Sequence, residues 1–127
     1  MTIFSPQDKA INISRSGTFA DLLVRFIRER NGGDAPAVYR AARIDRRTYS
    51  AIVSNPFRTV SKRTAIQFAL ALRLGRGDAD RLLLAAGYAL SPAVPEDVVV
   101  AAFIAGGEYD MFKINERLYA LGKKVMN

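Results

Sequence analysis

The chain has 127 residues, enough for about one domain, and half of its residues are apolar. It carries 19 lysines and arginines against 12 aspartates and glutamates, a net charge of +7, and it contains neither cysteine nor histidine. This composition excludes a disulfide framework, a cysteine nucleophile, a zinc finger and an imidazole base.

The hydrophobic runs are short. The longest, 98–105, has eight residues, whereas a membrane-spanning helix needs roughly 20. The first fifteen residues also lack the basic start and apolar block of a secretion signal. We therefore expect no membrane association and a cytoplasmic location.

The positive charge is concentrated in the first two thirds of the chain. Residues 15–81 carry 14 basic and 6 acidic side chains, whereas residues 82–127 carry 4 and 5. Within 40–63, Asp45 is the one acidic residue among seven cations: Arg40, Arg43, Arg46, Arg47, Arg58, Lys62 and Arg63. This excess predicts a polyanionic partner, the alternative being a solvated face that only maintains solubility. Arginine outnumbers lysine 14 to 5, and its planar fork suits phosphate and guanine edges.

Apolar residues recur at helical spacing along most of the chain. Helices are expected over roughly residues 18–30, 34–42, 45–55, 61–74, 78–87, 96–105 and 110–121. Thr18, Asp34, Asp45 and Ser61 stand where helix-capping residues belong. In the last helix we expect burial of Phe112, Leu118, Tyr119 and Leu121. No alternating strand pattern competes, so the sequence predicts a compact all-α bundle of about seven helices.

The predicted helices fall into three parts. Residues 1–16 have no clear period and are expected to form an arm. Residues 17–87 form a unit of five helices, and 88–127 form a two-helix extension that packs on this unit or dimerises it. The extension is nearly neutral and contains four aromatic residues, Phe103, Tyr109, Phe112 and Tyr119. These aromatics suit either completion of the core or a partner surface.

Two short helices joined by a tight turn lie between 34 and 54, an arrangement typical of a helix-turn-helix. If Tyr49, Ile52 and Val53 face the core, helical spacing puts four polar residues on the opposite side: Arg46, Arg47, Ser50 and Ser54. Cations in a first helical turn oppose the helix dipole by roughly 0.3–1 kcal/mol each, so an external anion is expected there. Lys62 and Arg63 repeat this pattern after Ser61, which predicts a second phosphate contact.

Residues 34–87 resemble the Cro/phage-repressor (XRE-type) DNA-binding domain, a likeness carried by the stretches ARIDRRTYSAIVSN, SKRTAIQFALALRL and DADRLLLAAGYALSP. The resemblance implies five helices, with a helix-turn-helix formed by the second and third. It also implies that Asp45 caps the recognition helix and that Arg46, Arg47 and Ser50 reach DNA. Together with EDVVVAAFIAGGEYDMFKINERLYALG, the same block resembles a module attached to some bacterial macro-domain proteins.

Three positions depart from the family pattern. Arg43 stands where the family usually has the glycine of the turn, so it must adopt a left-handed conformation or use a different turn. Tyr39 replaces a small alanine in the first helix of the motif, and Ala35 replaces a glutamine that often touches phosphate. These departures bear more on DNA binding than on the fold.

The sequence therefore predicts a transcriptional regulator that binds double-stranded DNA with a helix-turn-helix in the major groove. The expected DNA-binding residues are Arg43, Arg46, Arg47, Ser50, Ser54, Lys62 and Arg63. The alternative is a helical adaptor module with a degenerate helix-turn-helix and a protein partner, and a homodimer through 88–127 is a further expectation. We expect no enzyme activity, cofactor or metal, because the paired carboxylates stand at helix starts or in turns, where capping explains them.

Overall fold

The computed structural model describes residues 17–126, which contain seven α-helices and no strand. The helices are α1 (Phe19–Asn31), α2 (Ala35–Ala41), α3 (Arg46–Ser54), α4 (Lys62–Ala71), α5 (Arg76–Ala85), α6 (Pro95–Ala105) and α7 (Met111–Ala120). The all-α prediction is confirmed. The predicted arm, 1–16, lies outside the described residues. Among the helices described, none is both long and apolar enough to cross a membrane.

The predicted capping residues begin their helices. A side-chain oxygen of Thr18, Asp34, Asp45 and Ser61 accepts a hydrogen bond from a backbone N–H in the first turn of α1, α2, α3 and α4 respectively. Such caps satisfy donors that have no partner within the helix. The fifth helix was expected to start at Asp78, but α5 begins two residues earlier, at Arg76. Its N-cap residue is Gly75, which has no side chain to accept a capping hydrogen bond.

Two helices end on an arginine in the left-handed backbone conformation. Arg43 follows α2 with φ 59° and Arg73 follows α4 with φ 53°, whereas glycines take the same place after α5 and α6. For a residue with a side chain this conformation costs about 1–2 kcal/mol. The Arg73 guanidinium lies 5.1 Å from the centre of the Tyr109 ring, a cation–π contact that offsets part of this cost. Of the two alternatives expected for Arg43, a left-handed conformation or a different turn, the structure has the left-handed conformation.

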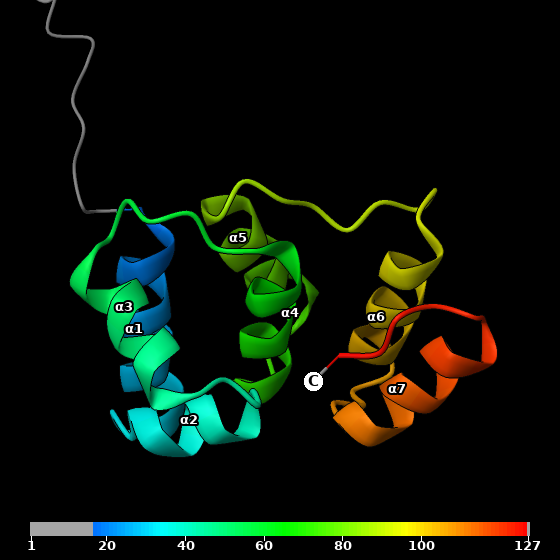
Figure 1. The fold of residues 1–127 in the computed structure, drawn as a ribbon, viewed down its shortest axis with the longest axis horizontal. Helices are drawn as coiled ribbons and strands as arrows, with labels where there is room; N and C mark the ends of the chain where they lie inside the picture. Colours follow the sequence, from blue (N-terminus) through cyan, green and yellow to red (C-terminus); the bar gives the residue numbers. More distant parts are fainter. Residues whose placement is uncertain (1–16, 127) are drawn as a thin grey trace, which may run out of the picture.

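Helix α4 lies at the centre of the bundle. Six consecutive residues, 65–70, are buried in it, and it packs against α2 and α5 (Figure 1). Aromatic rings join it to the neighbouring helices, with centroid distances of 6.2 Å from Phe68 to Phe19, 6.3 Å from Phe68 to Tyr49 and 5.2 Å from Tyr49 to Tyr39. Ring pairs at these distances stabilise a core beyond simple burial. The large Tyr39 is accommodated by its contact with Tyr49.

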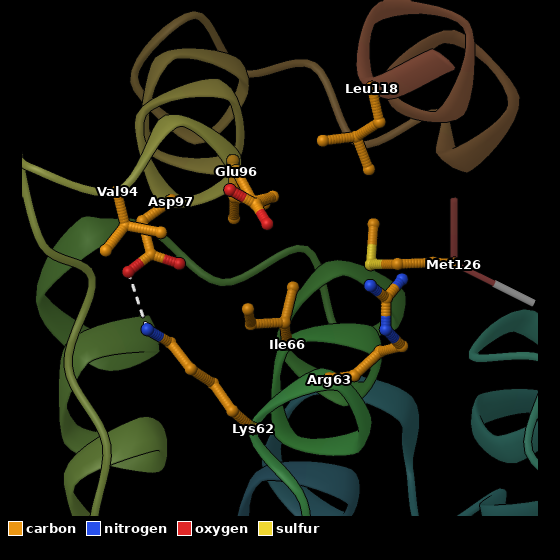
Figure 2. Close-up of a pocket in the computed structure, with 9 residues that line it drawn as sticks. Lys62, Arg63, Ile66, Val94, Glu96, Asp97, Leu118 and Met126 are labelled. Carbon is orange, nitrogen blue, oxygen red and sulfur yellow. Dashed lines mark hydrogen bonds and ion pairs between the residues drawn. The ribbon is translucent and has the colours of Figure 1, made fainter. Parts of the chain in front are cut away.

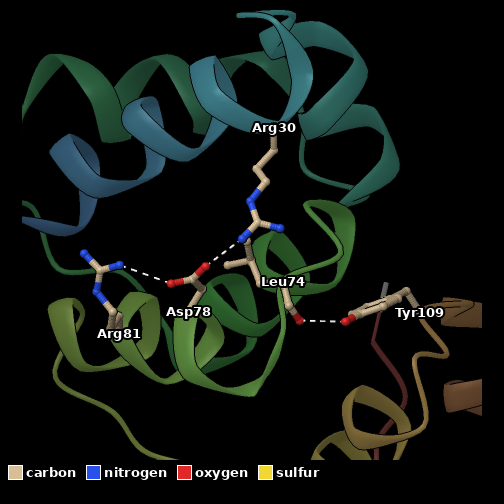
Figure 3. Close-up of polar contacts among 5 residues, drawn as sticks. All are labelled: Arg30, Leu74, Asp78, Arg81 and Tyr109. Carbon is tan, nitrogen blue, oxygen red and sulfur yellow. Dashed lines mark hydrogen bonds and ion pairs between the residues drawn. The ribbon is translucent and has the colours of Figure 1, made fainter.

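Helices α6 and α7 pack against each other, and α6 also packs on α5. The Tyr109 hydroxyl donates a hydrogen bond of 2.8 Å to the Leu74 carbonyl, while Asp78 accepts hydrogen bonds from Arg30 at 2.6 Å and from Arg81 at 3.1 Å (Figure 3). The Asp78 contacts join α1 to α5, whereas the Tyr109 hydrogen bond and the packing of α6 on α5 attach the two-helix extension to the first five helices.

The predicted buried face of α7 was partly wrong. Leu118 is buried, but Phe112 is 63% exposed, Tyr119 79% and Leu121 50%. The buried residues are instead Met111, Ile114 and Leu118. Their spacing of three and four residues defines one helical face, and Phe112 and Tyr119 lie outside it.

Replacement of Arg43 by glycine should stabilise the protein. Glycine adopts the left-handed conformation at little steric cost, so we expect Arg43→Gly to raise the free energy of unfolding by about 1 kcal/mol. Arg40→Gly is the matched control, because the same change inside α2 should lower that free energy by roughly 0.5–1 kcal/mol. Urea unfolding measures both. A destabilised Arg43→Gly variant would contradict the strain.

Candidate nucleic-acid interface

The turn between α2 and α3 is positioned by a buried amide from α4. Residues 42–45 connect the two helices. Gln67, 3% exposed, donates a hydrogen bond of 2.8 Å from Nε2 to the carbonyl of Ala42, which is itself fully buried. A buried carbonyl without a partner is costly, so this bond favours one placement of the turn. A polar residue within the apolar run of α4 was the sequence signal for this role, and sequence analysis missed it.

Helix α3 is anchored on its inner side by Ile52, which is buried, and by the half-buried Tyr49 and Val53. The expected outer face is exposed: Arg46, Arg47, Ser50 and Ser54. Asp45, Arg46, Arg47 and Ser50 line one shallow hollow on the surface. The structure thus brings the α3 residues of the predicted site together, with Arg43 exposed on the adjoining turn.

Five exposed arginines surround α3 and the turns that flank it. These arginines are Arg40, Arg43, Arg46, Arg47 and Arg58. None of them forms an ion pair with any of the residues 17–126. The six ion pairs in this part of the chain engage other cations, namely Arg25, Arg30, Lys62, Arg76, Arg81 and Lys113. Around α3 the described residues thus leave a cluster of arginines without ion pairs, with Asp45 as the acidic residue within 40–63.

Asp45 is the acidic group beside these arginines. Its Oδ1 accepts a hydrogen bond of 2.7 Å from the Thr48 amide. Hydrogen bonds from the Thr48 backbone and side chain lower the pKa of the Asp45 carboxyl, and the nearby charge of Arg47 lowers it further. Asp45 therefore stays ionised at neutral pH and caps α3. Its charge favours the positive end of the helix dipole, which Arg46 and Arg47 oppose.

Lys62 and Arg63 lie in a different place from the α3 group. Lys62 Nζ is 2.5 Å from Asp97 Oδ2 (Figure 2). Arg63 donates a hydrogen bond of 3.2 Å from Nη2 to the Lys124 carbonyl. Asp97 is 3% exposed and also accepts a hydrogen bond from the Ser91 amide. Both cations of α4 thus contact the C-terminal extension. Their partners lie far away in sequence, so local spacing could not indicate them.

Comparison with known proteins adds no relative. No family model, curated protein or solved structure matches this chain. The resemblance to XRE-type domains accordingly depends on the sequence stretches themselves.

The contribution of the Asp45 cap to the free energy of unfolding should depend on pH. Because its pKa is lowered on folding, the ionised carboxylate stabilises the native state above its unfolded pKa, and this contribution disappears as pH falls through the folded pKa. Asp45→Asn keeps a capping oxygen without the charge. We expect the difference in free energy of unfolding between wild type and Asp45→Asn to shrink between neutral pH and about pH 3 in urea titrations. A pH-independent difference would contradict this role.

Proposed function

We propose that this protein is a sequence-specific regulator that binds double-stranded DNA, with α2 and α3 acting as a helix-turn-helix and α3 entering the major groove. The observation that carries this proposal is a group of five exposed arginines around α3 that form no ion pair with any of the residues 17–126. Unneutralised arginines at the start of an exposed helix suit a phosphate backbone and base edges better than they suit water alone.

In this proposal base recognition belongs to the first two turns of α3. Arg46 and Arg47 are exposed at its first two positions, and Ser50 follows one turn later. Arginine can bind guanine through two hydrogen bonds, which is worth about 1–3 kcal/mol of discrimination against another base. Ser54, one turn further on, extends the same face toward the end of the helix.

Phosphate contacts belong to the flanking arginines. Arg40 and Arg43 lie at the end of α2, and Arg58 lies in the loop between α3 and α4. Each cation that neutralises a phosphate releases counterions, which makes affinity depend on salt. We leave Lys62 and Arg63 out of this surface, although the sequence predicted them, because Lys62 is paired with Asp97 and Arg63 contacts the C-terminal segment.

A second surface supports a protein partner, and we propose a second copy of the chain. Phe112 and Tyr119 are exposed on α7, and their separation of seven residues places them on one face. Exposed aromatics of this kind are enriched in interfaces. In Figure 1, α7 and α3 lie at opposite ends of the long axis. A two-fold dimer through α7 would present two α3 helices to half-sites separated by about 34 Å, one DNA turn, or a multiple of it.

Arginine substitutions distinguish base recognition from phosphate binding. On a site selected from genomic DNA, Arg47→Ala should lose about tenfold or more in affinity and much less on random duplex, because it removes a base contact. Arg58→Ala should weaken both duplexes alike and reduce the slope of log K against log salt by about one unit. Fluorescence anisotropy over a salt series measures both effects.

The matched control is Arg117→Ala, which removes the same charge from an exposed position on α7. It should leave affinity for the selected site within about twofold of wild type. Equal losses for Arg47→Ala and Arg117→Ala on every duplex would contradict recognition by α3. A stable protein partner, with weak retention of all duplexes, would favour the adaptor function instead.

The dimer proposal predicts a concentration-dependent mass. We expect sedimentation equilibrium to show a dimer at micromolar concentrations and a monomer for Phe112→Glu, because a charge in an apolar interface is costly. Leu84→Glu, a change at another exposed apolar residue, is the control and should leave the dimer intact. A wild-type monomer both with and without DNA would remove the proposal.

A further inference from the structure

A cavity of about 250 Å³ lies between α4, α6, α7 and the C-terminal segment (Figure 2). Its apolar wall includes Ile66, Val100, Leu118 and Met126, each of which is buried in the protein. Val94 and charged side chains of α4 and α6 complete the lining. The volume is slightly below the range of about 300–1,000 Å³ that is typical for drug-sized ligands, so a smaller molecule fits it better.

One donor on the cavity wall has no acceptor. Arg63 donates from Nη2 to the Lys124 carbonyl, but its Nη1 is buried and has no hydrogen-bond partner among residues 17–126. Buried polar groups are almost always paired in proteins, so this unpaired guanidinium nitrogen calls for an acceptor that residues 17–126 do not supply. The strongest acceptor for guanidinium is an anion, and carboxylate matches its geometry.

The other charged residues of the lining are Lys62 and Asp97, which pair with each other, and Glu96. Lys62 and Asp97 form an ion pair, and the Ser91 amide also donates to Asp97. Glu96 is half-buried and has neither an ion pair nor a side-chain hydrogen bond within the described part of the chain. The cavity therefore offers one cationic donor and one anionic acceptor that have no partner among the described residues, 17–126.

We propose that this cavity binds a small apolar α-amino acid. The ligand carboxylate accepts from Arg63 Nη1, the ligand ammonium donates to the Glu96 carboxylate, and the ligand side chain contacts Ile66, Val100 and Leu118. A carboxylic acid without an amine would bring a second negative charge toward Glu96, and an amine without a carboxylate would leave Arg63 unpaired. The zwitterion satisfies both groups, and an apolar side chain matches the wall.

This inference goes beyond DNA binding and does not depend on it. No residue that lines the cavity belongs to α2 or α3. Because the lining is drawn from α4, α6, α7 and the C-terminal segment, a bound amino acid would join the extension to the central helix. Ligand binding can therefore be measured on the full chain without DNA.

The test is a titration of the full chain with L-leucine and L-phenylalanine, followed by NMR and isothermal calorimetry. We expect saturable binding below about 10 mM. The comparators are 4-methylpentanoate, which lacks the amine, and 3-methylbutylamine, which lacks the carboxylate. Each should bind about tenfold or more weakly than L-leucine, because each leaves one buried or half-buried charge without its partner.

Two variants assign the contacts. Arg63→Met should weaken L-leucine binding about tenfold or more, and Glu96→Gln should weaken L-leucine but not 4-methylpentanoate. Arg28→Met, at an exposed position of α1, is the matched control and should bind like wild type. If Arg63→Met does not fold, Val100→Phe fills the cavity without changing its charges and should abolish binding. Absence of saturable binding to wild type, or binding of L-leucine by Arg63→Met and Glu96→Gln that equals that of wild type, would overturn the proposal.

Discussion

Charged side chains that form ion pairs lie apart from the arginines around α3, and the properties of this protein depend on that separation. Four aspartates of α1, α5 and α6 form ion pairs with cations: Asp21, Asp78, Asp80 and Asp97. Asp78 contacts Arg30 and Arg81, and Asp97 contacts Lys62. Around α3 the sole carboxylate within residues 40–63 is Asp45, which caps the helix. The ion pairs of the described residues thus lie away from α3, and the arginine-rich surface around α3 suits the polyanionic partner that we propose.

The packing that holds α3 is independent of that charge. Ile52 is buried below the helix, the Tyr39, Tyr49 and Phe68 rings connect it to α2 and α4, and Gln67 binds the turn through the Ala42 carbonyl. A surface used for recognition needs such support, because its own like charges repel one another. The same packing holds the turn in place, and it therefore maintains the unfavourable left-handed backbone conformation of Arg43.

The fold followed from local sequence signals to a large extent. The caps Thr18, Asp45 and Ser61 were predictable, because capping depends on neighbours within three residues. The exposed positions of Arg46 and Arg47 followed from helical periodicity. The role of Lys62 did not, because its carboxylate partner is 35 residues away. The three consecutive valines of α6 disfavoured a helix locally, yet Val99 and Val100 are buried in one, since tertiary packing outweighs propensity.

The face of α7 shows the same limit. Apolar residues on both sides of this helix made its buried side ambiguous from sequence, and the packing against α6 selected Met111, Ile114 and Leu118. The Arg63 environment was equally hidden, because it is formed by α4 together with the C-terminal segment. Contacts between distant segments thus determine both the buried face of α7 and the surroundings of Arg63, which local sequence patterns could not predict.

The salt dependence of wild-type affinity for duplex DNA is the sharpest test of DNA binding by the surface around α3. Three phosphate contacts, from Arg40, Arg43 and Arg58, predict that log K falls with log salt with a slope of about −2.7 per protomer. We also expect a selected genomic site to be preferred over random duplex at near-physiological salt. A slope near zero, with no preference between the two duplexes, would contradict a DNA-binding role for the surface around α3.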